Sequence, residues 1–145
     1  MINKMTNRIN VYLSGAIKNT DYKFQDWREY CSDSILAGFY PHLNIIDPNK
    51  FFNYTDKQPK TDKQCMDLFM YLLKKSDVLL VNLDQSNSSV GTGMEVEYAI
   101  CNNIPIIAFG NKPETWYKWV EISAAVILED AEEALEYIDN SYGVI

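Results

Sequence analysis

The amino-acid sequence predicts a single α/β domain, residues 1–145, with a doubly wound, flavodoxin/Rossmann-like parallel sheet that carries helices on both faces. Three observations predict this fold class. Short apolar segments alternate along the chain with longer segments of helical periodicity. Residues 78–81 are a continuous apolar run, typical of a strand that is buried on both faces. The length of 145 residues is that of one domain with a sizeable core.

The first half of the chain is expected to contain two strands and two helices. Residues 10–14 form a short apolar run that ends at Gly15, which predicts a strand and its turn. A helix is expected from about residue 22 to residue 37, because Phe24, Trp27, Cys31 and Ile35 recur there at helical spacing before Gly38. The remaining expected elements are a strand at 43–46, a polar loop at 49–62 that is long enough to cover a site, and a helix at about 62–75.

The second half repeats the alternation. The buried strand at 78–81 is followed by a stretch rich in turn-forming residues, 82–93. The expected elements after it are a helix at about 94–102, a strand at 105–109, an aromatic segment with Trp116, Tyr117 and Trp119, a strand at 125–128 and an acidic helix at about 131–138. Ligands of such sheets bind beyond the carboxyl ends of the strands, so the loops there are the first place to look for a site.

Composition and charge exclude several classes of function. The net charge of −7 and the pI of about 4.6 oppose binding to the phosphate backbone of a nucleic acid. The three cysteines form no CxxC pair and His42 is the only histidine, which supports neither a metal site nor a disulfide framework. The first ten residues lack the apolar core of a signal peptide, and no run is long enough to span a membrane. We therefore expect a cytoplasmic protein with no membrane partner.

The segment with the most chemical potential is Ser88-Ser-Val-Gly-Thr-Gly-Met-Glu95, between the buried strand and the next helix. Its glycines permit close approach of a ligand to the backbone, and N–H groups at a helix start attract anions. Glu95 is expected in the first turn of that helix. A purely structural role is the alternative, in which the glycines make a tight turn and Glu95 complements the helix dipole. The segment is neither a Walker A loop nor a GxGxxG fingerprint.

Three motifs in order resemble the nucleoside 2-deoxyribosyltransferase superfamily, which includes the deoxynucleoside 5′-monophosphate N-glycosidases. They are Val11-Tyr-Leu-Ser-Gly-Ala-Ile17, Lys75-Ser-Asp-Val-Leu-Leu-Val-Asn-Leu83 and Ser89-Val-Gly-Thr-Gly-Met-Glu95 with Tyr98-Ala99. The resemblance covers nearly the whole chain from Asn10. It implies cleavage or transfer at the N-glycosidic bond of a nucleoside or its 5′-monophosphate, without metal or organic cofactor. It also implies a homo-oligomer, a dimer or higher, whose sites are shared between subunits.

The resemblance assigns roles to individual residues. Glu95 matches the nucleophile that attacks C1′ of the sugar, and covalent capture by a carboxylate divides one displacement into two easier ones. Tyr12 matches a tyrosine that contacts the sugar or orients the glutamate. The other positions implied to surround the substrate are Ser14, Gly15, Ala16, Gly91, Gly93 and Met94, with Asn82 and Asp84 at the carboxyl end of the buried strand as further candidates.

Two serines bear on the kind of substrate. Ser89 stands six residues before Glu95, where the transferases have an aspartate for the 5′-hydroxyl and the monophosphate glycosidases have a phosphate-binding serine. A serine avoids placing a carboxylate against a phosphate dianion, so it favours a 5′-monophosphate. Ser123 resembles a second phosphate-binding serine, which a neighbouring subunit contributes. The alternative for Ser123 is an ordinary loop serine.

One position departs from the family pattern. The family has an acid that protonates the leaving base or positions the sugar, eight residues before the aspartate that corresponds to Asp77, and here that position is Phe69. Asp67 is the nearest acid, but two residues along a helix are about 200° of rotation. General acid help is worth about 10²–10⁴-fold. Two hypotheses therefore remain: an enzyme that uses Glu95, with Asp67 as its second acid, or a weakly active or inactive nucleotide-binding protein in which Phe69 is an apolar wall.

Overall fold

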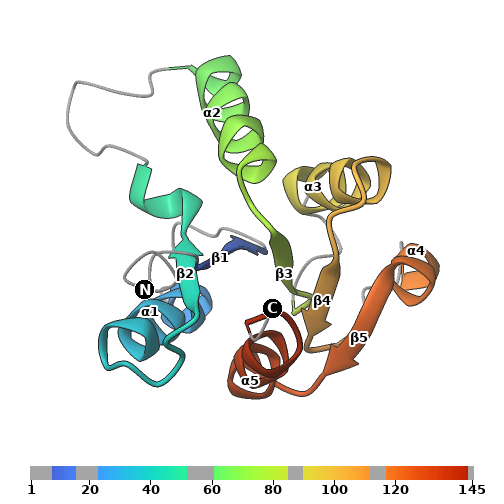
Figure 1. Ribbon diagram of the computed structural model, residues 1–145. Coiled ribbons are helices and arrows are strands. Elements are labelled where there is room, and N and C mark those ends of the chain that lie inside the picture. The colour runs from blue at the N-terminus through green and yellow to red at the C-terminus, as the bar shows by residue number, and fades with distance from the viewer. Residues whose placement is uncertain (1–7, 16–22, 52–60, 85–89, 112–116, 144–145) are drawn as a thin grey trace.

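The computed structural model describes residues 8–15, 23–51, 61–84, 90–111 and 117–143 (Figure 1). Within these ranges five parallel strands form one sheet in the order β2-β1-β3-β4-β5. The strands are β1 (Ile9–Ser14), β2 (Leu43–Ile46), β3 (Val78–Asn82), β4 (Ile106–Phe109) and β5 (Ala124–Leu128). This is the doubly wound α/β fold that the sequence predicts. The strand order reverses between β1 and β3, and ligands of such sheets bind outside the carboxyl ends of the strands at that reversal.

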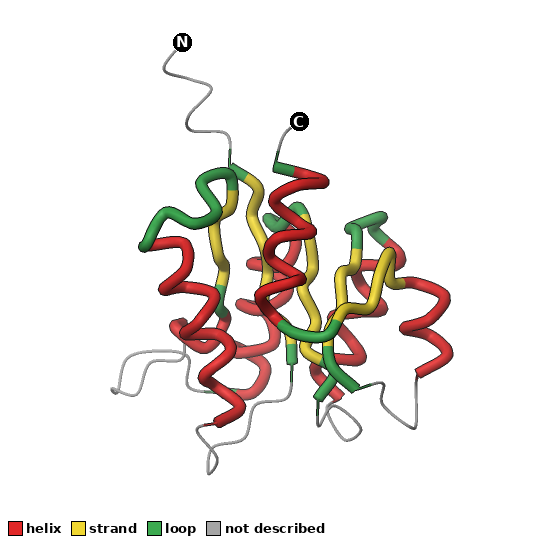
Figure 2. Tube along the Cα trace, turned by 90° about the horizontal axis from the view of Figure 1, so that it is seen from below, coloured by secondary structure: helices red, strands yellow, loops and turns green. Residues whose placement is uncertain are grey.

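The helices cover both faces of the sheet, as Figure 1 shows. On one face lie α1 (Lys23–Leu36) and α5 (Ala131–Tyr142), and on the other lie α2 (Asp62–Lys74), α3 (Val90–Cys101) and α4 (Tyr117–Ser123). A short 3-10 helix, η2 (Pro48–Phe51), follows β2. In Figure 2 the strands run side by side, and α5 ends beside the starts of β1 and β2.

Two apolar cores follow from this layering, because successive side chains of a strand point to opposite faces. Val11 and Leu13 of β1 belong to the core under α1 and α5. Tyr12 belongs to the core under α2, α3 and α4. All five residues of β3 are buried, which confirms the prediction of a strand covered on both faces.

Local sequence explains several helix ends. Thr61 begins α2 with a capping box, in which its hydroxyl accepts from the Gln64 backbone and the Gln64 side chain accepts from the Thr61 N–H. Asp130 caps α5 by accepting from the Glu133 N–H. Within the described ranges, no helix has the length and apolar character needed to cross a bilayer.

The structure corrects one expected boundary that matters for the site. Helix α3 begins at Val90, four residues earlier than the sequence predicts, so Gly91 and Gly93 are helical and Glu95 lies in the second turn. The reason is that glycine also adopts helical dihedral angles, and neither glycine has a positive φ here. Two smaller differences concern the end of the chain, where residues 117–123 form α4 and α5 continues to Tyr142.

Candidate active site

Three side chains from two elements converge at the carboxyl end of β1. Tyr12 and Ser14 are two residues apart on the strand and so point to the same face. Glu95 reaches them from α3, with its carboxylate buried. The Tyr12 hydroxyl donates to Oε2 of Glu95, and the Ser14 hydroxyl donates to Oε1 at 2.5 Å. The structure thus brings together three residues to which the resemblance assigns roles.

The surroundings of Glu95 act on its pKa in opposite directions. Burial raises the pKa of the Glu95 carboxyl, whereas the hydrogen bonds from Ser14 and Tyr12 and the positive charge of Arg28 lower it, and the net direction is upward. Burial, followed by the charge of Glu95, raises the pKa of the Tyr12 phenol far above its ordinary range. Tyr12 is therefore a neutral donor at any physiological pH, and its hydrogen bond favours the ionised form of Glu95.

This geometry is suited to a nucleophilic carboxylate. Each oxygen of Glu95 accepts one hydroxyl, which fixes the carboxylate plane, and each keeps a further lone pair. The low local dielectric strengthens these hydrogen bonds and removes competing water. Among the described residues, no group of three or more His, Cys, Asp or Glu side chains gathers as metal ligands would.

Gly15, directly after the last residue of β1, is tightly packed. A Cβ atom added to Gly15 would stand 3.2 Å from the Asn82 Cβ and 3.3 Å from a ring carbon of Trp27. The Gly15 carbonyl accepts a hydrogen bond of 3.1 Å from Nη2 of Arg28. The backbone at Gly15 is therefore fixed from α1 on one side and from the end of β3 on the other.

Arg28 is the residue that sequence reasoning missed. It is 2% exposed, although arginine is almost never fully buried without a partner. A signal for it was present in the sequence, because Arg28 lies among Phe24, Trp27 and Cys31 on the apolar side of the expected helix. A charged residue inside an apolar stripe indicates a buried ion pair or a site.

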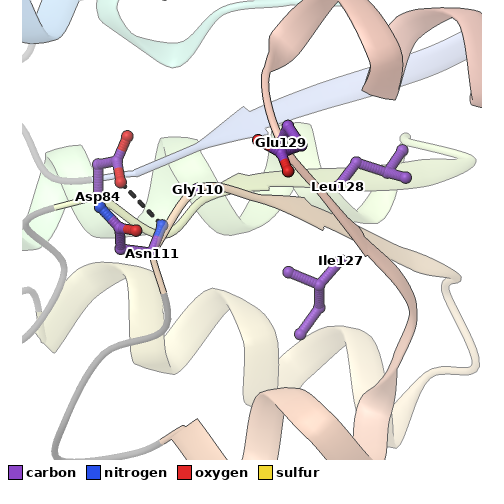
Figure 3. A pocket seen from close by; sticks show the side chains of 6 residues that line it. All are labelled: Asp84, Gly110, Asn111, Ile127, Leu128 and Glu129. Carbon is purple, nitrogen blue, oxygen red and sulfur yellow. Dashed lines mark hydrogen bonds between the residues drawn. The ribbon is translucent and has the colours of Figure 1, made fainter.

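Asn82 and Asp84 lie at the carboxyl end of β3, where the sequence places them, and Asp84 lines a cavity there. Oδ1 of Asn82 accepts from the Asp84 N–H at 2.9 Å, and Oδ1 of Asp84 accepts from the Asn111 N–H at 2.8 Å. Figure 3 shows Asp84 and Asn111 together, with Ile127 and Glu129 of the neighbouring chain segment across from them. This cavity has a volume of about 320 Å³.

Asp67 and Phe69 lie on α2 and have different surroundings. The Asp67 carboxylate is 59% exposed and forms an ion pair of 2.7 Å with Lys63, one helical turn before it. Phe69 is half-buried. No hydrogen bond recorded for the described residues joins Asp67 to Tyr12, Ser14 or Glu95.

The other candidate residues are distributed as follows. Gly93 and Ser123 line an apolar groove of about 500 Å³ between α3 and α4, with Val96, Glu97, Ile100, Trp119 and Ile122. The Ser123 hydroxyl donates to the Trp119 carbonyl at 2.5 Å, and the Met94 side chain is exposed. Ala16 and Ser89 lie outside the described residues.

Comparison with known proteins identifies the family. The family model for nucleoside 2-deoxyribosyltransferase matches residues 11–137, whereas no curated protein matches the sequence. Among solved structures, a conserved protein from Enterococcus faecalis V583 superposes with a TM-score of 0.70 and 16% identity, over 92% of this chain and 98% of that one. A 2-deoxyribosyltransferase from Bacillus psychrosaccharolyticus superposes with a TM-score of 0.67 and 13% identity, over 88% and 91% of the two chains. The structural likeness shows a shared fold, and the match over residues 11–137 shows that the chain belongs to the nucleoside 2-deoxyribosyltransferase family.

Proposed function

We propose that the protein cleaves or transfers the N-glycosidic bond of a deoxynucleoside or its 5′-monophosphate, with Glu95 as nucleophile. The observation that carries the proposal is the buried Glu95 carboxylate that accepts hydroxyl hydrogen bonds from both Tyr12 and Ser14. Membership of the nucleoside 2-deoxyribosyltransferase family supports a glycosyl-transferring enzyme in general.

In this mechanism a Glu95 oxygen forms a bond to C1′ while the C1′–N bond breaks. The bonding electron pair leaves with the base, which takes up a proton at nitrogen. A glycosyl ester of Glu95 results, and attack at C1′ by water gives the free sugar, whereas attack by a second base gives a new nucleoside. Tyr12 and Ser14 hold the carboxylate during the first step and stabilise it as it leaves in the second.

The source of the proton for the leaving base separates the two candidate functions. If Asp67 supplies it, the side chain has to leave Lys63, with which it forms an exposed ion pair. That pairing, together with Phe69 at the family's acid position, favours the second candidate: a nucleotide-binding protein on the same scaffold with little or no turnover. Phe69 then provides an apolar wall against the ligand.

We further propose that Ser89 binds the 5′-phosphate of the substrate. Replacing Ser89 by aspartate places a negative charge against the phosphate dianion, so binding of the monophosphate should weaken by at least tenfold while binding of the nucleoside changes little. Isothermal titration with both ligands measures this ratio. An equal effect on nucleoside and monophosphate removes the assignment.

The deciding experiment for the function uses purified protein and a panel of deoxynucleosides and their 5′-monophosphates. Free base is followed by chromatography, with and without a second acceptor base. Glu95→Gln and Glu95→Ala should reduce turnover by about 10³-fold or more while retaining ligand binding. Base release or exchange that disappears in both variants supports the enzyme. Ligand-induced stabilisation without any product supports the binding protein.

A further inference from the structure

The α1 helix buries a cation behind the candidate site. The chain has two arginines, Arg8 and Arg28, of which Arg8 is exposed and Arg28 is fully buried. A buried guanidinium is strongly disfavoured unless a counterion and hydrogen bonds compensate for lost hydration. Burial lowers the pKa of Arg28, and the charges of Asp47 and Glu95 raise it. Both of these carboxylates therefore stabilise the Arg28 cation.

Asp47 neutralises Arg28 only in part. Nε of Arg28 and Oδ1 of Asp47 are 3.7 Å apart, which is longer than a hydrogen bond, and the same oxygen accepts from the Asn49 N–H at 2.9 Å. Nε and Nη1 of Arg28 have no hydrogen-bond partner among the described residues. The guanidinium also lies over the Trp27 ring, 4.7 Å from its centroid. Part of the positive charge therefore remains available to other groups nearby.

The contacts of Arg28 lead to the nucleophile through the chain. Nη2 donates to the Gly15 carbonyl, and Gly15 is bonded to Ser14, whose hydroxyl donates to Glu95. Trp27, the neighbour of Arg28 on α1, has a ring carbon 3.3 Å from where a Cβ of Gly15 would stand, and its ring meets Phe109 edge to face, with ring centroids 5.4 Å apart. A displaced guanidinium would release the Gly15 backbone, and with it the orientation of the Ser14 hydroxyl.

We propose that Arg28 is a positioning residue of the site: it holds the backbone at Ser14 and Gly15, and its charge favours the ionised form of the Glu95 carboxylate. The part that concerns catalysis rests on the proposed function, and the part that concerns ionisation does not. The titratable groups that act on Glu95 are Tyr12 from β1 and Arg28 from α1. Those that act on Arg28 are Asp47 after β2, Glu95, Tyr12 and Cys31.

The test measures the pKa of Glu95 directly, in protein labelled with ¹³C at the glutamate carboxyls. The Glu95 resonance is the one missing from Glu95→Gln. Arg28→Gln should raise this pKa because it removes a cation. Asp47→Asn should lower it, because it removes the anion that partly neutralises Arg28. Arg8→Gln, the same change at an exposed arginine, is the control and should leave it unchanged.

Opposite shifts in Arg28→Gln and Asp47→Asn support the proposal, because loss of packing does not reverse sign between two partners. No shift in either variant, or a shift in the same direction in both, overturns it. If Arg28→Gln does not fold, the direction in Asp47→Asn decides.

Kinetics separate the charge of Arg28 from its hydrogen bond. Arg28→Lys keeps the cation but loses the planar fork, so the pKa of Glu95 should stay near the wild-type value while kcat falls by about tenfold with little change in KM. An unchanged kcat removes the positioning role. If the wild-type protein releases no base, the proposed function fails, and the carboxyl titration still decides whether Arg28 controls Glu95.

Discussion

At the scale of single residues, the Glu95 carboxylate is buried, and burial alone favours its protonated form. The hydroxyls of Ser14 and Tyr12 and the charge of Arg28 favour the ionised form instead. Holding that anion in a low dielectric costs free energy. The proposed role of Glu95 as nucleophile requires its ionised form, so under that proposal an upward pKa places the acidic limit of activity above the ordinary range of a carboxyl. Such sites commonly lower the stability of the fold in exchange for reactivity.

Glu95→Gln should therefore stabilise the protein at neutral pH. Because the pKa of Glu95 is raised on folding, the native state binds the proton more tightly than the unfolded state, and stability falls as pH rises from the ordinary value of 4.5 through the higher native pKa. Glutamine carries no charge, so this penalty disappears. We expect a gain of about 1 kcal/mol at neutral pH, or roughly 2–4 °C in Tm, that shrinks as pH is lowered.

Thermal unfolding between about pH 4 and pH 8 measures this difference, with Glu29→Gln, an exposed glutamate of α1, as the control. A stability gain in Glu95→Gln that is independent of pH would show that burial of the charge is not its cause.

At the scale of elements, two glycines with a positive φ follow the ends of a strand and a helix. Gly110 after β4 has a φ of +96°, and a Cβ atom there would lie 2.8 Å from Oδ1 of Asp84. Gly38 after α1 has a φ of +83° but open space around it. The two glycines thus share the backbone requirement and differ in the surrounding space.

Variants of Gly38 and Gly110 allow the free-energy cost of backbone strain to be measured separately from that of a steric clash. Gly38→Ala should cost about 1 kcal/mol, because only the left-handed backbone opposes the new Cβ. Gly110→Ala should cost about 2–3 kcal/mol, because it also displaces the Asp84 carboxylate that accepts from Asn111. Urea unfolding of both variants gives the two free energies, and equal values would mean that Asp84 moves aside freely.

Helix α3 provides a different prediction, because Gly91 is helical with open space where a Cβ would lie. Gly91→Ala should stabilise the protein by about 0.5–1 kcal/mol. If the glycine serves close approach of a substrate, the same variant should weaken ligand binding. Increased stability with unchanged ligand affinity would leave Gly91 without a binding role.

At the scale of the whole molecule, the groove between α3 and α4 is the surface on which we base a proposed homo-oligomer. Trp119 and Ile122 on its border are 65% and 81% exposed. Large apolar side chains gathered around a groove indicate an interaction site more often than single exposed ones do. Gly93 and Val96, on the helix that also carries Glu95, line the same groove.

Ile122→Asp should dissociate such an oligomer, because it places a charge in an apolar interface. Light scattering across a range of protein concentrations measures the mass. Leu36→Asp is the matched control, since Leu36 is 85% exposed at the end of α1 and does not line the groove. A wild-type protein that is monomeric at every concentration contradicts the proposal.

The sequence by itself determined the layered α/β fold, because apolar periodicity and turn-forming residues are properties of short segments. They indicate helices, strands and turns without any knowledge of how these elements pack. The run at 78–81 indicated a strand buried on both faces, and Gly38 indicated the end of a helix, as observed. The start of α3 was missed, because glycine gives no local preference for helix over loop.

Only the tertiary structure decided how the site is assembled. Tyr12 and Glu95 are separated by 83 residues, and nothing local fixes the direction in which either hydroxyl of β1 donates. The fold brings Arg28 of α1 against Asp47 after β2 and Gly15 at the end of β1, two segments distant in the sequence, while its guanidinium lies over Trp27 of the same helix. The exposure of Asp67 is likewise decided by the rotation of α2 on the sheet, whereas its pairing with Lys63, four residues earlier on the same helix, is local. Short-range patterns specify elements, whereas the electrostatics of a site arise from which elements the fold brings together and from the water that they exclude.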